Sequence, residues 1–168
     1  MLKPLPFATQ TFRKIVEDGL LYVDKTKHIY ELIQHPDGVY FLSRPRRFGK
    51  SLLISTLEEI FKGEKELFHG LWLYESDYKW QSYPVLRIDF SWHNVTNADS
   101  LQVVIDSYLT ELAEAHGIRL NGFDYQSRFR NLILQLGKKA KVVILIDEYD
   151  KPILDNVAQI DEAQRIRD

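Results

Sequence analysis

The sequence predicts an α/β fold in which helices flank a parallel sheet. Residues 141–147 form a β-branched run that is apolar on both faces, which is typical of a parallel strand covered by helices on each side. Amphipathic helical stripes separate this run from two earlier candidate strands, residues 39–42 and 85–90. The resulting order of strand, helix, strand, helix, helix and strand favours parallel strands joined by helical crossovers.

The first third of the chain predicts two helices and two short strands. Residues 20–23 are a short apolar run, and the helix that follows them ends at Pro36-Asp37-Gly38. Residues 39–42 then predict a buried strand. Residues 51–61 predict a helix, because apolar side chains recur at i, i+4, i+7 and i+8 before Gly63 ends it. The apolar positions of these two helices are Ile29, Leu32, Ile33, Leu53, Leu57, Ile60 and Phe61.

The rest of the chain carries the clearest periodicity. After the strand at residues 85–90, residues 99–115 predict a long helix that Gly117 ends, and a shorter helix ends at Gly137. The strand at residues 141–147 follows. The apolar stripes of the two helices are Leu101, Val104, Ile105, Tyr108, Leu109 and Leu112 in the first, and Phe129, Leu132, Ile133 and Leu136 in the second.

Composition narrows the classes of function. The length of 168 residues fits one domain, and 22 basic against 24 acidic residues give a net charge of −2, so no global field attracts nucleic acid or membrane. Without cysteine there is no disulfide framework, thiolate nucleophile or zinc–thiolate site. The longest aliphatic run, residues 142–146, is far too short to span a bilayer. We therefore expect a soluble, cytoplasmic protein without a membrane partner.

The segment at residues 39–52 has the layout of a P-loop. A predicted strand and a short basic loop lead to Gly49-Lys50-Ser51 at the start of a helix. In that context loop N–H groups surround phosphate, a lysine reaches the β- and γ-phosphate oxygens, and a hydroxyl contacts Mg²⁺. The general pattern needs a glycine where Arg44 stands, followed here by Pro45. The alternative is a basic surface turn that happens to precede a helix.

Asp147 and Glu148 form the second signal. They follow a hydrophobic strand, as do the carboxylates with which P-loop ATPases contact the water shell of Mg²⁺ and the attacking water. An exposed acidic turn is the alternative. Both segments stand at the carboxyl ends of predicted parallel strands, where open α/β sheets bind ligands. Together they indicate a nucleotide site more strongly than either does alone.

These segments resemble a known family. Arg-Pro-Arg-Arg-Phe-Gly-Lys-Ser-Leu at residues 44–52 is similar to the loop of the AAA-ATPase-like family, in which Arg-Pro-Arg-Arg replaces the first glycine. Tyr-Val-Asp-Lys-Thr at 22–26 and Leu-Ile-Asp-Glu-Tyr-Asp-Lys-Pro at 145–152 extend the resemblance, which covers the chain from residue 5 onward. Domains of this family are often joined to a C-terminal PD-(D/E)XK nuclease-like domain.

The resemblance implies Mg²⁺-dependent ATP binding, with ATP hydrolysis by the complete domain. It implies that Ser51 and Asp147 contact Mg²⁺, that Lys50 stabilises phosphate charge and that Glu148 is the catalytic base. The nucleotide-binding positions it implies are Arg44, Pro45, Arg46, Arg47, Phe48, Gly49, Lys50, Ser51 and Leu52. We expect Asp24-Lys25-Thr26 either to border the nucleotide base or to cap the start of a helix.

The resemblance also sets the expected domain limits. In such ATPases a strand with the sensor residue follows the acidic strand, and only 16 residues (168 minus 152) follow Pro152. We expect residues 1–168 to be the N-terminal portion of one ATPase domain, truncated after the acidic strand, with sensor, lid and nuclease-like parts absent. Residues 1–37 would be an N-terminal extension and residues 38–168 the P-loop core.

Two other functions remain open. One is a nucleic-acid-binding module, because four cations lie within seven residues of the basic loop. The nearby Tyr40, Phe41 and Phe48 could stack on bases, although the first two lie in the predicted core strand, which favours burial. The other is a nucleotide-binding scaffold without turnover. Further expected partners are a homo-oligomer, as in many such ATPases, and nucleic acid bound through an absent nuclease-like domain.

Overall fold

The computed structural model describes residues 2–7, 9–34, 38–43, 45 and 47–167. By its internal contacts the chain divides into two compact units, Met1–Tyr83 and Pro84–Asp168, called here the N-terminal and C-terminal units. Each is described by itself. Among the described residues, no helix is long and apolar enough to cross a membrane.

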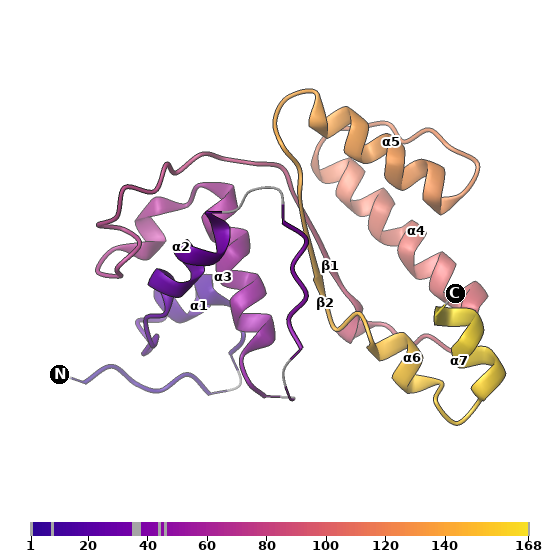
Figure 1. Cartoon of the computed structure of the whole chain (residues 1–168), viewed down its shortest axis with the longest axis horizontal. Coiled ribbons are helices and arrows are strands. Elements are labelled where there is room, and N and C mark those ends of the chain that lie inside the picture. Colours follow the sequence, from indigo (N-terminus) through magenta and orange to yellow (C-terminus); the bar gives the residue numbers. More distant parts are fainter. Residues whose placement is uncertain (1, 8, 35–37, 44, 46, 168) are drawn as a thin grey trace. The chain divides into compact units, whose positions relative to one another are not determined.

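The N-terminal unit contains helices and no strand within its described residues (Figure 1). The helices are α1 (Phe12–Glu17), α2 (Thr26–Ile33), α3 (Lys50–Lys62) and the short 3₁₀ helix η1 (Lys65–Phe68). The prediction of a helix over 51–61 is confirmed by α3, which ends where Gly63 adopts φ 79°. At that end the Gly63 and Glu64 N–H groups donate to the Ile60 and Glu59 carbonyls.

The contact between α1 and α3 organises the N-terminal unit. The Phe12 N–H, at the start of α1, donates to Ser55 Oγ on α3 at 2.9 Å. One turn further along α3, the buried Glu59 carboxylate accepts two hydrogen bonds from Arg13, from Nε at 3.2 Å and from Nη2 at 2.7 Å. The Phe12 ring stacks on Phe68 with a centroid separation of 4.5 Å. These contacts hold α3, the helix that follows the basic loop, to the rest of its unit.

The prediction of a buried strand at residues 39–42 is wrong. These residues form no strand, and the side chains of Val39, Tyr40, Phe41 and Leu42 are exposed. A short apolar run becomes a buried strand only where a neighbouring strand and covering helices exist, and the described part of the N-terminal unit offers no strand. The short strand predicted at residues 20–23 is also absent, and this segment connects α1 to α2. Pro36 and Asp37, predicted to end α2, lie outside the described residues.

The C-terminal unit is a two-stranded parallel sheet with flanking helices. The predicted α/β class with parallel strands is confirmed at this level. The strands are β1 (Val85–Asp89) and β2 (Val143–Asp147), and their register pairs Val85 with Val143 and Asp89 with Asp147. Between them lie the 3₁₀ helix η2 (Phe90–Trp92), α4 (Ala98–Ala115) and α5 (Tyr125–Gly137); α6 (Lys151–Asp155) and α7 (Ile160–Arg167) follow. The predicted helices at 99–115 and ending at Gly137 are thereby confirmed.

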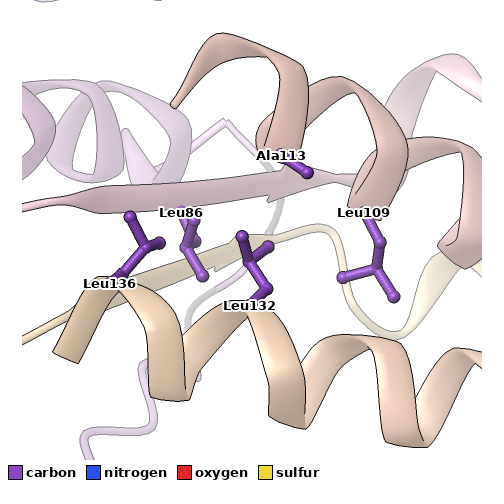
Figure 2. Close-up of a cluster of buried hydrophobic side chains, with 5 residues drawn as sticks. All are labelled: Leu86, Leu109, Ala113, Leu132 and Leu136. Carbon is purple, nitrogen blue, oxygen red and sulfur yellow. The ribbon is translucent and has the colours of Figure 1, made fainter. Parts of the chain in front are cut away.

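Capping and packing explain the two long helices. Asn97 begins α4 and Asp124 begins α5, and each forms a reciprocal capping box with the serine three residues later. Their apolar stripes pack against β1. Figure 2 shows the core of this contact, with side chains from β1, α4 and α5 facing one another. The residues of this core are Leu86, Leu109, Ala113, Leu132 and Leu136.

One expectation about β2 is wrong. The run at residues 141–147 is apolar on both faces, yet Ile144 and Ile146 are 39% and 44% exposed, while Leu145 and Asp147 are buried. Within the described residues β2 pairs only with β1, so it is an edge strand. β1 is equally an edge strand, but its Leu86 and Ile88 are buried, because the core residues of α4 and α5 pack on Leu86. Ile144 and Ile146, their register partners in β2, lie outside that core cluster and remain exposed. Both strands nevertheless end at the same edge of the sheet, where ligands bind in α/β folds.

Candidate functional site

The start of α3 has the backbone geometry expected of an anion-binding loop. Arg47 and Gly49 have φ values of 65° and 77°, in the left-handed region, immediately before Lys50 opens the helix. A Cβ on Gly49 would touch nothing within 4 Å, so glycine is suited to this position by its φ and not by lack of space. The turn costs less for glycine than for Arg47, which adopts a conformation that non-glycine residues rarely take.

The N-terminus of α3 has no side-chain cap among the described residues, and its first turn holds no acidic residue. The first N–H groups of a helix lack partners within the helix and carry partial positive charge, so they attract anions. Lys50 and Ser51 are half-buried here, and Pro45, Arg47 and Phe48 are exposed. Leu52 is half-buried, and its carbonyl accepts a hydrogen bond from Thr56 Oγ1 at 2.8 Å. Arg44 and Arg46, predicted nucleotide contacts, lie outside the described residues.

Asp147 is the most deeply buried acid of the candidate site. Its residue is 3% exposed, its Oδ1 accepts a hydrogen bond from the Glu148 N–H at 3.1 Å, and its Oδ2 accepts none from any residue that the structure describes. A buried charged oxygen without a partner is costly. A cation at Oδ2 would remove that cost, so the donor chemistry fits Mg²⁺, which proteins bind through one or two carboxylates and water.

Glu148 stands in a strained turn directly after β2. Its φ is 50°, which a non-glycine residue rarely adopts, and its side chain is half-buried. The Lys151 N–H donates to the Glu148 carbonyl at 3.0 Å, so the turn leads straight into α6. Strain of this kind persists where the surrounding structure fixes it, and it is frequent at active sites. The backbone of Glu148 thus has a defined conformation just beyond the end of the strand.

Sequence reasoning missed a third acid, Asp89, at the end of β1. The parallel register pairs it directly with Asp147. Its Oδ1 accepts a hydrogen bond from the Ser91 N–H at 2.9 Å, which caps η2, and its Oδ2 lies 3.6 Å from Arg87 Nη2. The available signal was that two predicted parallel strands, residues 85–90 and 141–147, each carry an aspartate at or next to their last residue, and the carboxyl ends of such strands meet at one edge.

Hydrogen bonds fasten the segment after β1 to the helices around it. Lys151 Nζ donates to the His93 carbonyl at 2.9 Å, and the buried Asn156 Nδ2 donates to the Val95 carbonyl at 2.6 Å. From α4, the Tyr108 hydroxyl donates to the Asp89 carbonyl. Burial, reinforced by the Asp89 charge, raises the pKa of Tyr108, so this hydroxyl keeps its proton. The carboxyl ends of both strands are therefore fixed from α4 and α6.

Asp24-Lys25-Thr26 serves the fold of the N-terminal unit. Asp24 Oδ1 accepts from the Thr26 N–H and hydroxyl at 2.8 and 2.7 Å, and its Oδ2 accepts from the Trp72 N–H at 2.7 Å. Thr26 Oγ1 in turn accepts from the Leu73 N–H at 3.0 Å. Burial opposes ionisation of Asp24, but the hydrogen bonds from Thr26 and Trp72 outweigh it and lower its pKa. The side chains of Asp24 and Thr26 thus join the start of α2 to residues 72–73.

No group of three or more histidine, cysteine, aspartate or glutamate side chains is placed to share a metal within the described part of the chain. Any divalent cation would be held by one or two carboxylates, with water and ligand oxygens completing its shell. Lys50 and Ser51 belong to the N-terminal unit, and Asp147, Glu148 and Asp89 to the C-terminal unit.

Comparison with known proteins places the chain in a family. The family described as Predicted AAA-ATPase matches residues 6–168. The chain belongs to the Predicted AAA-ATPase family. A relative from Azotobacter chroococcum mcd 1, described as an uncharacterized protein in the vnfD 5' region, is 45% identical over 170 residues. That alignment covers 99% of this chain and 33% of the relative, so the chain spans about a third of the relative's length. No solved structure matches. Membership of the Predicted AAA-ATPase family supports nucleotide binding.

Proposed function

We propose that the chain binds Mg·ATP as part of a P-loop ATPase domain, and that the longer protein hydrolyses it. Loop N–H groups and Lys50 would hold phosphate oxygens, and Ser51 and Asp147 would supply oxygen ligands to the cation. Bound Mg²⁺ would neutralise phosphate charge. Glu148 would accept a proton from the attacking water, and attachment to a nuclease-like domain is part of the same proposal for the longer protein.

The start of α3 is the observation that carries this proposal. The 13-residue helix α3 begins at Lys50, after left-handed Arg47 and Gly49 and without a side-chain cap among the described residues, in a chain of the Predicted AAA-ATPase family. Glycine is a common residue before a helix, but it supplies no side-chain oxygen to the first N–H groups. The open N–H groups are the feature that phosphate would satisfy.

Calorimetric titration of this chain with Mg·ATP tests the proposal. We expect Lys50→Ala to weaken binding about 10- to 100-fold, because hydrogen bonds to charged groups contribute roughly 1.5–3 kcal/mol. Lys62→Ala is the matched control, since Lys62 lies at the other end of the same helix and pairs with Glu58 at 2.6 Å. It should bind like the wild type. Parallel titrations with ADP and GTP would establish the preferred nucleotide.

Two results would refute the proposal. One is a folded chain that does not bind at millimolar Mg·ATP, and the other is Lys50→Ala binding as tightly as Lys62→Ala. Hydrolysis is tested separately by phosphate release from the longer protein, where Glu148→Gln should retain nucleotide binding and lose turnover. Binding without turnover in the wild type would support the scaffold alternative.

One observation favours the nucleic-acid alternative. The three aromatic side chains near the basic loop are exposed: Tyr40 by 51%, Phe41 by 70% and Phe48 by 65%. The predicted burial of Tyr40 and Phe41 therefore does not hold, and exposed aromatic rings are the side chains on which bases stack. The same protein titrated with single-stranded DNA at about 50 and 200 mM salt would detect it, since phosphate contacts weaken steeply with salt. Binding of that kind, retained when Mg·ATP binding is absent, would replace the nucleotide proposal.

A further inference from the structure

The ends of the two strands bring two carboxylates together. Asp89 and Asp147 are register partners in a parallel pair, and paired residues of neighbouring strands project from the same face about 4.8 Å apart at the backbone. Both belong to the C-terminal unit, so the pairing is internal to one compact part of the chain. Two ionised carboxylates on neighbouring positions of one sheet face repel each other unless a proton or a cation lies between them.

Neither carboxylate is fully satisfied by its neighbours. Asp147 is 3% exposed, and its Oδ2 has no hydrogen-bond partner within the described ranges. The Asp89 side chain is 17% exposed, and its Oδ1 accepts a hydrogen bond from the Ser91 N–H. Arg87 lies 3.6 Å from Asp89 Oδ2, beyond good hydrogen-bond distance, and only partly offsets the two charges. The pair therefore retains oxygen lone pairs that can bind a cation.

The surrounding structure holds the backbone that carries both carboxylates. Tyr108 fixes the Asp89 carbonyl, and Lys151 ties the segment after Asp89 to the helix that follows Asp147. A ligand pair held by such hydrogen bonds binds a cation without first paying to order its own backbone. Two carboxylates and bound water are the protein ligands that Mg²⁺ commonly uses, and the remaining waters can later be replaced by phosphate oxygens.

We infer that Asp89 and Asp147 together form a divalent-cation site, and that the C-terminal unit binds this cation before nucleotide is present. Asp89 is then a second metal-binding residue, contacting the ion directly or through one of its waters. The inference deepens the proposed function and rests on it only in the identity of the cation as Mg²⁺. The site itself needs no residue of the basic loop.

A purely structural role for Asp89 is the competing explanation, because the residue caps η2 and lies beside Arg87. Asp89→Asn separates the two roles. Asparagine keeps an Oδ1 that can accept from the Ser91 N–H but removes the charge. Asp124→Asn is the matched control, since Asp124 likewise accepts a serine N–H, from Ser127 at 2.7 Å, and begins α5 instead of ending a strand.

The probe is Mn²⁺, whose free concentration is measured by electron paramagnetic resonance during titration of this chain without nucleotide. We expect Asp89→Asn and Asp147→Asn each to weaken Mn²⁺ binding about 10- to 100-fold, and Asp124→Asn to leave it unchanged. Mg²⁺ should compete for the same site. In the wild type, Mn²⁺ should broaden the amide NMR signals of Ser91 and Glu148 at the lowest metal concentrations, a result that needs no variant to fold.

The inference is overturned if the folded wild type binds no Mn²⁺ at millimolar metal, if Asp89→Asn binds as the wild type does, or if broadening begins elsewhere. Mg·ATP titration of the same samples separates the two hypotheses. Mn²⁺ binding that depends on Asp89, in a chain that does not bind ATP, would support this site and refute the proposed function. If Asp89→Asn changes neither ATP binding nor Mn²⁺ binding, the proposed function is supported and this cation site is refuted.

Discussion

Replacing either partner of the Arg13–Glu59 ion pair should have unequal effects on stability. The Glu59 side chain is 6% exposed and accepts two hydrogen bonds from Arg13, whereas the Arg13 side chain is 38% exposed. Arg13→Ala therefore leaves a buried carboxylate without its cation, and such losses cost about 3–5 kcal/mol. Glu59→Ala leaves a guanidinium that still reaches water and Glu64, at 3.4 Å, so we expect about 1–2 kcal/mol.

Native-state hydrogen exchange of the α3 amides, read as a function of urea, measures this difference within the N-terminal unit. Lys62→Ala is again the control, because the Lys62 side chain is 43% exposed and pairs with Glu58 one turn away on the same helix, and such i,i+4 pairs contribute about 0.3–0.5 kcal/mol. The reasoning fails if Glu59→Ala destabilises α3 as much as Arg13→Ala does. It fails equally if both variants match the surface control, since burial would then confer no special cost.

Two further predictions concern Asn156 in the C-terminal unit and Tyr78 in the N-terminal unit. Asn156→Ala should lower the stability of the C-terminal unit by about 1–3 kcal/mol in urea denaturation, because the Val95 and Pro152 carbonyls each lose a donor, at 2.6 and 2.9 Å; a change below 0.5 kcal/mol, roughly the surface level, would contradict this. Burial raises the pKa of Tyr78 to about 12. The unfolded chain releases this proton at lower pH than the folded chain does, so the contribution of Tyr78 to the free energy of unfolding should be fully present below about pH 10 and decline as the pH rises towards 12. Ultraviolet absorbance at about pH 11 checks this by counting ionised tyrosines: the wild type should show about one fewer than an equimolar mixture of Tyr78→Phe and free tyrosine.

Much of the C-terminal unit could be predicted from the sequence, because its signals are long and local. The stripes of α4 and α5 repeat over several turns, and the β-branched run marks β2. The burial of residues 39–42 could not be predicted, because an apolar run does not reveal whether a neighbouring strand exists. The same limit applies to Ile144 and Ile146, which are exposed because α4 and α5 form their core with Leu86 of β1 and not with β2.

The candidate site shows the same division. Lys50, Ser51, Asp147 and Glu148 could be proposed from motifs, since a motif is a local spacing. The tie from Asp24 to Trp72 joins residues 48 positions apart, and no local pattern encodes it. Asp89 required the register of β1 against β2, which only the folded sheet supplies.

That register makes the spacing of Asp89 and Asp147 depend on a core that neither residue belongs to. Asp89 and Asp147 are 58 positions apart in the chain (147 minus 89), and nearly all of the intervening chain is the crossover that carries α4 and α5. The two carboxylates remain neighbours only while those helices stay packed on β1. Loosening the core at Leu109 or Leu132 would therefore separate the acids without touching either of them. Substitutions in that apolar core would thus have the same effect on cation binding as substitutions of the two aspartates.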